Sequence, residues 1–194
     1  MTDEELMQAV CNGNQSAYQE LVKQHLKSIS HYAFRLLGNQ KDSEDITQET
    51  FLKLWINAKR WQPEKAKLST WLHRITHNLC IDYLRKNGNT QTQDFSVAER
   101  EDESRKNDLQ DAISEHAEFA RLDAAIKQLP ESQRSALMLC HYAGFSTKEA
   151  AAIMSVSVKA LESAIARARH SLRIMLADDN AEPTHSEEKT GSIG

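Results

Sequence analysis

Residues 146–176 read STKEAAAIMSVSVKALESAIARARHSLRIML, and this stretch decides the fold of the C-terminal part of the chain. Its spacing predicts a short helix over 147–154, a three-residue turn and a longer helix over 158–176. Ser146 and Glu149 have the spacing of a capping box for the first helix. Two helices joined by so tight a turn form a helix-turn-helix, a unit that many proteins use to read DNA.

The longer helix carries two different faces. At about 100° per residue its apolar residues fall on one stripe, which must pack against other helices. The opposite face is polar and fits either solvent or a DNA major groove. Arg167 can bind guanine in bidentate fashion, and Ser163 lies one turn away from it. The candidate DNA contacts of this unit are Ser157, Lys159, Ser163, Arg167, Arg169 and His170.

A plainer alternative remains for this unit. The polar face is not strongly basic, and Glu162 lies at its edge. Phosphate contacts supply much of the affinity for DNA, so this unit alone should bind DNA weakly. A small helical bundle with a solvated, mixed-charge surface would show the same pattern.

Composition extends the helical prediction to the whole chain. The chain has 194 residues with 40% hydrophobic side chains, and only three prolines and six glycines, too few turn signals for an all-β sandwich. We expect an all-α protein of two small helical domains. The domains are 1–87 and 119–177, joined by a flexible acidic linker over 88–118 and followed by a disordered tail over 178–194.

Charge is unevenly distributed along the chain. The formal net charge is −4, yet residues 87–120 alone carry nine acidic and three basic side chains. The two predicted domains are therefore mildly basic, which is compatible with nucleic acid. Three well-separated cysteines and an acidic N-terminus without an apolar signal core predict a soluble cytoplasmic protein with reduced thiols and no membrane insertion of its own.

An acidic and apolar face is predicted on the helix that begins at Asp42, whose carboxylate we expect to cap it. Paired carboxylates can act as acid and base in glycoside hydrolysis, but Asp45 and Glu49 lie at an exposed helix start without any sign of a pocket. A docking face for a protein is the better interpretation, because tryptophan is enriched at interface hot spots. The face consists of Asp45, Gln48, Glu49, Leu52 and Trp55.

The next predicted helix, 69–86, carries a polar stripe and follows a loop that contains Trp61. Cations interleaved with aromatic rings suit single-stranded nucleic acid, because bases stack on rings and phosphates meet charges. The alternative is that Trp61 and Trp71 are core residues. The candidate contacts are Lys65, Lys67, Trp71, Arg74, His77, Asn78 and Arg85.

His73, His77 and Cys80 lie on one side of this helix and superficially suit zinc. The first and last are separated by about 10 Å of helical rise, too far for one ion to reach both comfortably. We therefore predict no metal site, no catalytic residue and no cofactor. A metal-dependent enzyme or metal sensor that uses His73 and His77 remains the rival from another class.

Three segments of the chain resemble bacterial sigma factors. The run from Asp42 to Trp55 is similar to their core-polymerase-binding segment, and Ser69 to Lys86 is similar to their −10-reading helix. Leu129-Pro-Glu-Ser-Gln-Arg, followed by the helix-turn-helix, is similar to their −35-reading domain. With only two such domains and a short linker, the chain resembles the extracytoplasmic-function (ECF) sigma factors over about residues 3–176.

The resemblance implies roles and partners. Asp45, Gln48 and Glu49 would dock on core RNA polymerase, the 61–70 loop and the Asn78 face would hold the melted −10 strand of promoter DNA, and Arg167 with Ser163 would read the duplex −35 element. It also implies an anti-sigma partner. Glu162 and Ala164 stand where the family often has basic residues, and Ser155 where it often has glycine. An autonomous helix-turn-helix repressor remains the rival among DNA-binding proteins.

Overall fold

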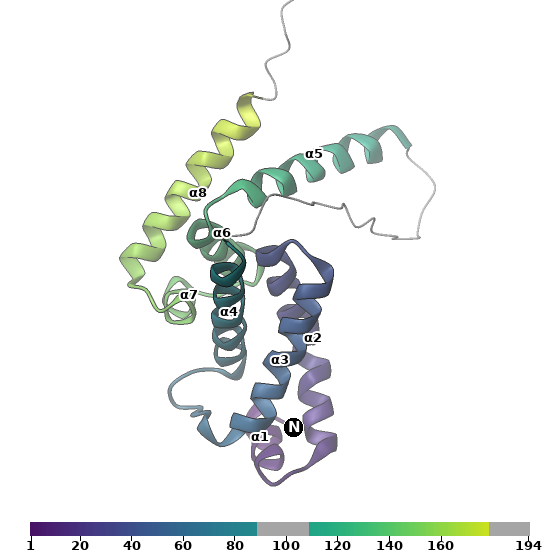
Figure 1. Cartoon of the computed structure of the whole chain (residues 1–194), viewed down its shortest axis with the longest axis vertical. Coiled ribbons are helices and arrows are strands. Elements are labelled where there is room, and N and C mark those ends of the chain that lie inside the picture. The colour runs from purple at the N-terminus through teal and green to yellow at the C-terminus, as the bar shows by residue number, and fades with distance from the viewer. Residues whose placement is uncertain (89–108, 179–194) are drawn as a thin grey trace, which may run out of the picture.

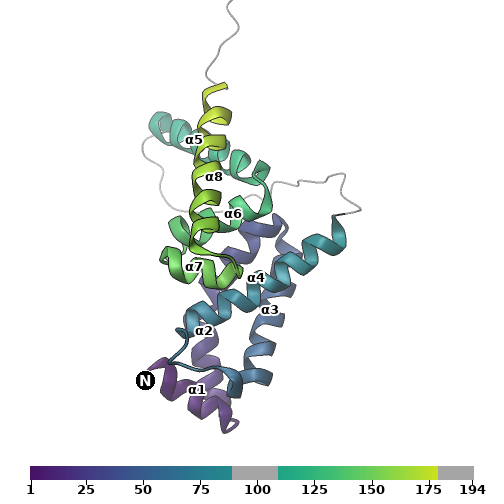
Figure 2. The same ribbon diagram turned by 90° about the vertical axis from the view of Figure 1, so that its left-hand side faces the viewer.

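The computed structural model describes residues 1–88 and 109–178, and every regular element in those ranges is a helix. The expected all-α class is thereby confirmed. Figure 1 shows α1 at the lower end of the molecule and α5 and α8 toward its upper end, and in both Figure 1 and Figure 2 helix α7 lies beside α4. The elements are α1 (Asp3–Cys11), α2 (Gln15–Leu37), α3 (Gln40–Asn57), η1 (Ala58–Arg60), α4 (Leu68–Asn87), α5 (Leu109–Gln128), α6 (Glu131–Leu137), η2 (Met138–Tyr142), α7 (Thr147–Met154) and α8 (Val158–Asp178).

The ends of α1 and α2 follow local signals in the sequence. The side chain of Asn14 accepts a hydrogen bond from the Ala17 amide and starts α2. Gly38 ends α2 with a φ of 68°, a left-handed conformation that glycine adopts without steric cost. Neither glycine nor proline interrupts the chain between Asn14 and Gly38, so α2 runs unbroken over 23 residues.

The start of α3 differs from the expectation. Its N-cap is Asn39, whose side chain accepts a hydrogen bond from the Asp42 amide, so Asp42 is not the cap. The Asp42 carboxylate instead accepts a hydrogen bond from the Tyr83 hydroxyl of α4. This contact raises the pKa of Tyr83 to about 12. The local pattern predicts that the Asp42 carboxylate caps the helix, but this carboxylate is bound by Tyr83, a residue 41 positions later.

Two clusters of buried side chains hold the fold together. The first, named here the lower core, joins α1 to α4 and η1. Its buried members are Leu6, Met7, Val10, Ala17, Leu21, Ile29, Phe51, Leu54, Ala58, Leu68 and Leu72. The second, named here the shared core, combines Tyr32, Ala33, Leu36, Ile46 and Cys80 from the N-terminal half with buried side chains of α5 to α8.

The helix-turn-helix consists of α7 and α8. The capping box of Ser146 and Glu149 is present, as predicted, and the Ser157 side chain accepts a hydrogen bond from the Ala160 amide at 3.1 Å. Between the helices, Ser155 adopts a φ of 56°. This left-handed conformation is strained for a residue with a Cβ atom. The turn therefore uses serine where glycine would fit better.

The predicted linker and tail fall largely outside the described residues. Within the described part, helix α5 begins at Leu109, so residues 109–118 are helical although we expected them in the linker. Alanine and glutamate, which favour helices, recur in this stretch. The domain limits 1–87 and 119–177 stay a prediction. No helix in the described ranges is both long and apolar enough to cross a bilayer.

Candidate nucleic-acid and protein interfaces

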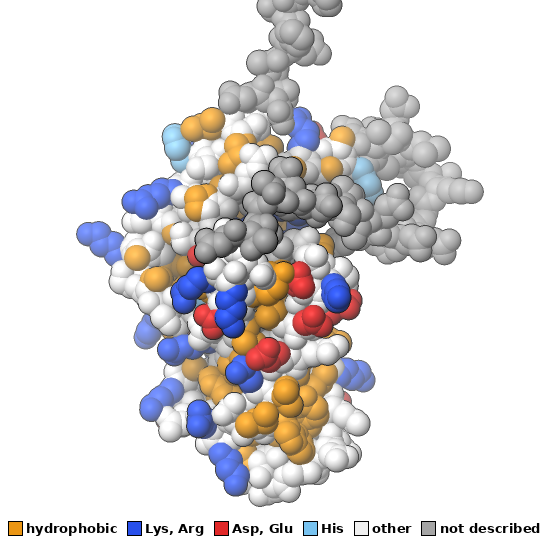
Figure 3. Space-filling model, viewed as in Figure 1, with side chains coloured by type: hydrophobic (Ala, Val, Ile, Leu, Met, Phe, Trp, Pro, Cys, Tyr) orange, Lys and Arg blue, Asp and Glu red, His pale blue; other side chains and the backbone are white. Residues whose placement is uncertain are grey.

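The outer face of α3 carries the predicted docking residues. Asp45, Gln48 and Glu49 are exposed, and Leu52 is 54% exposed, which is a large fraction for leucine. Figure 3 shows an orange apolar patch over the lower part of α3 with acidic side chains above it. These residues, together with Lys53 and Ile56, line one shallow groove. An acidic rim beside exposed apolar side chains suits a protein partner.

Trp55 is held in this face by its neighbours. Its ring meets the edge of the Tyr18 ring with centroids 5.2 Å apart, and the Tyr18 hydroxyl donates to the Phe51 carbonyl at 3.1 Å. Sequence reasoning missed Ile56, which is 66% exposed in the same groove. Its spacing of four residues from Leu52 places both on one helix face, so the signal was present in the sequence.

A polar stripe runs along α4. Arg74, Asn78 and Arg85 are all exposed, and their spacing places them on one side of the helix, as predicted. Arg85 also lies 3.8 Å from Asp82, an exposed pair that contributes little to stability. Lys65 is exposed in the loop that precedes α4. The stripe and this loop each present exposed cations to solvent.

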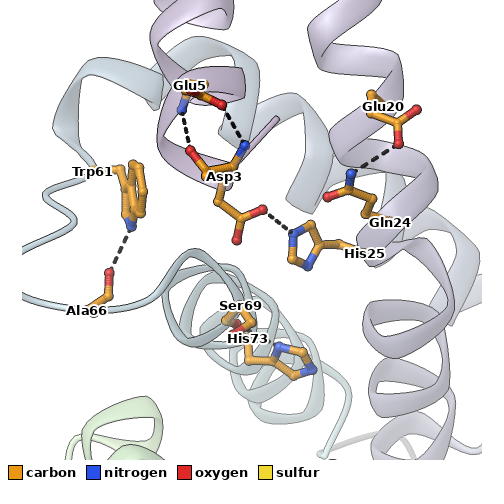
Figure 4. Close-up of polar contacts among 10 residues, drawn as sticks. Asp3, Glu5, Glu20, Gln24, His25, Trp61, Ala66, Ser69 and His73 are labelled. Atoms are coloured by element: carbon orange, nitrogen blue, oxygen red, sulfur yellow. Dashed lines mark hydrogen bonds and ion pairs between the residues drawn. The ribbon is translucent and has the colours of Figure 1, made fainter.

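Both tryptophans of this region are partly built into the fold. Trp61 and Trp71 pack against the lower core. The indole N–H of Trp61 donates to the Ala66 carbonyl at 3.0 Å and fixes the shape of the loop (Figure 4). The core alternative for these rings is therefore correct in part, because each ring is half-buried. Lys59 and Arg60, exposed just before the loop, add two cations that sequence reasoning missed.

His77 does not join the polar stripe. It is 5% exposed, and its Nδ1 lies 2.8 Å from the Tyr32 hydroxyl of α2. The expectation that His77 contacts DNA therefore finds no support in this geometry, because its ring faces the interior. Burial lowers the pKa of His77 from 6.5 to about 4, so the ring is neutral at physiological pH.

His73 is buried beside His77 and fully hydrogen-bonded. Its Nδ1–H donates to the Ser69 carbonyl at 2.7 Å, since a carbonyl can only accept, and its Nε2 accepts from the Ser28 hydroxyl at 3.0 Å. Burial lowers the pKa of His73 to about 4, against the opposing effect of the Ser69 carbonyl. Figure 4 shows this histidine with Ser69.

These contacts argue against the metal-dependent alternative, because they engage the histidine nitrogens that would have to bind the metal. Both ring nitrogens of His73 and one of His77 already have protein partners. Burial also raises the pKa of the Cys80 thiol to about 12, whereas zinc binds the thiolate. Within residues 1–88 and 109–178, no group of three or more His, Cys, Asp or Glu side chains is arranged to hold a metal ion.

The outer face of α8 is open, as the helix-turn-helix interpretation requires. Ser157, Lys159, Ser163, Arg167, Arg169 and His170 are all exposed. On the inner side, Leu161, Ile165 and Ala168 are buried in the shared core. Arg169 donates a hydrogen bond to the His141 ring at 2.7 Å. This bond ties one candidate phosphate contact to the η2 segment.

Comparison with known proteins identifies both halves of the chain. The family model for sigma-70 region 2 matches residues 21–90, and the model for sigma-70 region 4 matches residues 119–172. The ECF RNA polymerase sigma factor SigE of Mycolicibacterium smegmatis is 35% identical over 181 residues, which span 90% of this chain and 68% of that protein.

Two solved structures resemble the fold. One is CnrH in complex with the cytosolic domain of CnrY, with 27% identity, a TM-score of 0.68 and coverage of 92% of this chain and 99% of that one. The other is the sigma factor RpoE of Bartonella quintana in complex with the anti-sigma factor NepR, with 26% identity, a TM-score of 0.66 and coverage of 84% and 98%.

Proposed function

This chain belongs to the ECF sigma factors of the sigma-70 family, and from that membership we propose that it binds bacterial core RNA polymerase and directs it to a particular set of promoters. One observation carries the proposal: regions 2 and 4 of the family follow each other in one chain, in the family's order. Proteins of this family are transcription factors and not enzymes. The polymerase supplies the chemistry, and we propose no cofactor for this chain.

We assign polymerase docking to the outer face of α3. The acidic side chains Asp45 and Glu49 would guide a basic partner surface to this face, and Leu52 and Trp55 would supply the apolar anchor. Gln48 lies between the two acids and can both donate and accept hydrogen bonds. Asp45, Gln48, Glu49 and Leu52 line one groove, which supports the assignment.

We assign binding of the melted −10 strand to α4 and the loop before it. Lys65, Lys67 and the stripe of Arg74, Asn78 and Arg85 would neutralise phosphates along the strand. The half-buried ring of Trp71 leaves part of one face free to stack on a base. We leave His77 out of this set, since its bond to Tyr32 makes it a positioning residue for α4.

We assign −35 reading to the outer face of α8. Arg167 and Ser163 lie one helical turn apart on that face and would reach base edges in the major groove. Lys159, Arg169 and His170 flank them and would contact phosphates. Ser157 stands at the helix N-terminus, where backbone amides favour an anion such as a phosphate.

Two further properties follow from the proposal. RpoE, a relative in fold, is held by an anti-sigma factor, so we propose an anti-sigma partner for this chain as well. Bacterial core polymerase works in the cytoplasm, so we place this chain there.

The decisive experiment is size-exclusion chromatography of the purified chain with bacterial core RNA polymerase. We expect co-elution, and Asp45→Ala with Glu49→Ala should reduce it while the far-UV circular dichroism spectrum stays unchanged. Glu44→Ala is the matched control, because Glu44 is also exposed on α3 but does not line the groove. Clean separation of the folded wild-type chain from polymerase would reject the proposed function.

A further inference from the structure

The π-helical segment η2 lies just before the helix-turn-helix and carries two exposed polar side chains. The Ala143 amide donates to the Met138 carbonyl at 2.9 Å, a bond that spans five residues, whereas an α-helix spans four. Such wide turns are rare and often occur at functional sites. Met138 and Leu139 are buried in the shared core, whereas His141 and Tyr142 are exposed. The segment therefore presents side chains that can form hydrogen bonds close to α7.

Arg169 of α8 fixes the tautomer of the His141 ring. The Arg169 guanidinium lies 2.7 Å from His141 Nε2, and arginine can only donate. Nε2 is therefore the acceptor, so the ring is neutral in this pair and carries its proton on Nδ1. Among the residues that the structure describes, this Nδ1–H has no hydrogen-bond partner. The ring thus offers an unused donor beside the guanidinium.

The positive charge of Arg169 is not compensated within the pair, because its partner is a neutral ring. The Lys67 ammonium, by contrast, lies 3.5 Å from the Glu149 carboxylate, so a phosphate at Lys67 must compete with a fixed anion. Burial raises the pKa of the Cys140 thiol in η2, and the nearby Arg169 cation opposes this rise. Figure 3 shows Lys and Arg side chains along the left-hand edge of the molecule, where α8 lies. The pair can therefore attract an anion.

The bond to His141 also holds the guanidinium in one place before any ligand binds. A free arginine side chain samples many rotamers, and ordering it on binding reduces affinity. In helix-turn-helix proteins the first helix crosses the DNA backbone while the second lies in the major groove. Here α7 is that first helix, and residues 143–146 connect it to η2. The pair therefore lies beside the expected path of the DNA backbone.

We propose that His141 and Arg169 form one binding site for a phosphate of the −35 DNA backbone, named here the His141–Arg169 site. The guanidinium supplies the charge, and His141 Nδ1–H supplies a second donor. His141 is also a positioning residue, because it orients Arg169. The proposal rests on the proposed function, which places α8 in the major groove. Since backbone contacts fix register without reading sequence, the site strengthens binding to all promoters alike.

Nitrogen-15 NMR of the histidine rings in the free full-length chain tests the geometry without DNA. At about pH 8, where exposed histidines are neutral, we expect His141 to be protonated on Nδ1. Arg169→Ala should remove this preference, and His116, exposed on α5, is the reference ring. A wild-type His141 protonated on Nε2 would overturn the proposal, because Arg169 could not then donate to that nitrogen.

Fluorescence anisotropy of a labelled duplex of mixed sequence, titrated with the full-length chain at low salt, measures binding to the backbone. His141→Ala should bind about three- to tenfold more weakly than the wild type, the loss expected for one hydrogen bond. His141→Gln should bind like the wild type, because its amide oxygen can accept from Arg169 and its amide nitrogen can donate to phosphate. His116→Ala is the matched control and should bind unchanged. Equal weakening by alanine and glutamine at position 141 would overturn the proposal.

Arg169→Ala and the double variant show whether the two residues act as one site. Arg169→Ala should lower the slope of log affinity against log salt by about 0.9, the value for one phosphate. His141→Ala should weaken binding less in the Arg169→Ala background than in the wild type, because its positioning role is already lost. Fully additive losses would overturn the shared site.

The wild-type titration separates this proposal from the proposed function. A wild-type chain that binds the duplex, with an unaffected His141→Ala variant, would reject only the His141–Arg169 site. A folded wild-type chain that binds no duplex would reject the −35 assignment itself, and the site with it.

Discussion

The ring of Phe145 lies edge-on against the ring of His73, at 70° between planes, and this pair joins the C-terminal half of the molecule to helix α4. Hydrogen bonds with Ser28 and Ser69 hold the His73 ring in place, so the Phe145 ring packs against a rigid surface. Four predictions follow from this pair, from the buried histidines, from the turn at Ser155 and from the outer face of α8.

Phe145→Ala should lower the free energy of unfolding. The half-buried ring loses its contact with His73 and with the shared core, so we expect a loss of about 1–3 kcal/mol, below the range for a fully buried phenylalanine. Urea denaturation followed by circular dichroism measures it. Phe119→Ala is the control, because Phe119 is 66% exposed and its removal should change stability little. Equal effects of the two substitutions would contradict the packing role of Phe145.

Stability should fall as the pH drops from about 6.5 to about 4. Burial lowers the pKa of both His73 and His77 from 6.5 to about 4, so the unfolded chain binds more protons in that window. Each such shift is worth about 3 kcal/mol over the whole window. Above pH 6.5 the contribution is fully present, because both rings are neutral in the folded and unfolded states.

Urea denaturation at several pH values tests this dependence. His77→Gln should flatten the slope between pH 6.5 and pH 4, since one of the two buried rings is then absent. His116→Gln, at an exposed position on α5, should leave the slope unchanged. A slope that is the same in wild type and His77→Gln would show that His77 does not carry this dependence.

Ser155→Gly should stabilise the chain. Ser155 adopts a φ of 56°, and glycine removes the Cβ clash at that angle. Part of the gain is offset by the greater freedom of glycine in the unfolded chain, so we expect about 0.5–1 kcal/mol. Thermal unfolding measures the change, and Ser155→Ala, which keeps the Cβ atom, should give no gain. A lower melting temperature for the glycine variant would refute the strain argument.

Arg167→Ala should reduce promoter discrimination. A bidentate arginine–guanine contact contributes about 1–3 kcal/mol of selectivity, so transcription from promoters mutated in the −35 element should become more uniform. Run-off transcription on a panel of such promoters measures this loss. Arg173→Ala, also on exposed α8, removes a cation at the margin of the face and should weaken all promoters alike. Unchanged selectivity in the Arg167 variant would remove this residue from the reading face.

Local patterns predicted much of this fold. The helix at 147–154 and its capping box of Ser146 and Glu149 match the prediction, and the longer helix predicted over 158–176 extends two residues further, to Asp178. Both follow from capping residues and apolar periodicity, which depend on neighbours within one or two turns. The exposed stripe of Arg74 and Asn78 follows from the same periodicity.

Contacts between distant residues were beyond such patterns. His77 and Asn78 are neighbours on α4 that face different sides of the helix, and the buried His77 ring is bound by Tyr32, which is 45 residues earlier. Asp42 is a residue type typical of a helix cap, yet its carboxylate accepts a hydrogen bond from the Tyr83 hydroxyl, 41 residues later in the chain. A two-domain pattern likewise gives no sign that Leu36 and Leu139 belong to one core.

The shared core has a consequence for how freely parts of such chains can be exchanged. A chimera that keeps region 2 of this chain and takes region 4 from a relative would place foreign side chains against Tyr32, Leu36 and Ile46. The promoter-reading face of the grafted half would be intact, but its inner face would no longer match. Hybrids of this kind should therefore pack loosely where the two halves meet, even when each half is well folded.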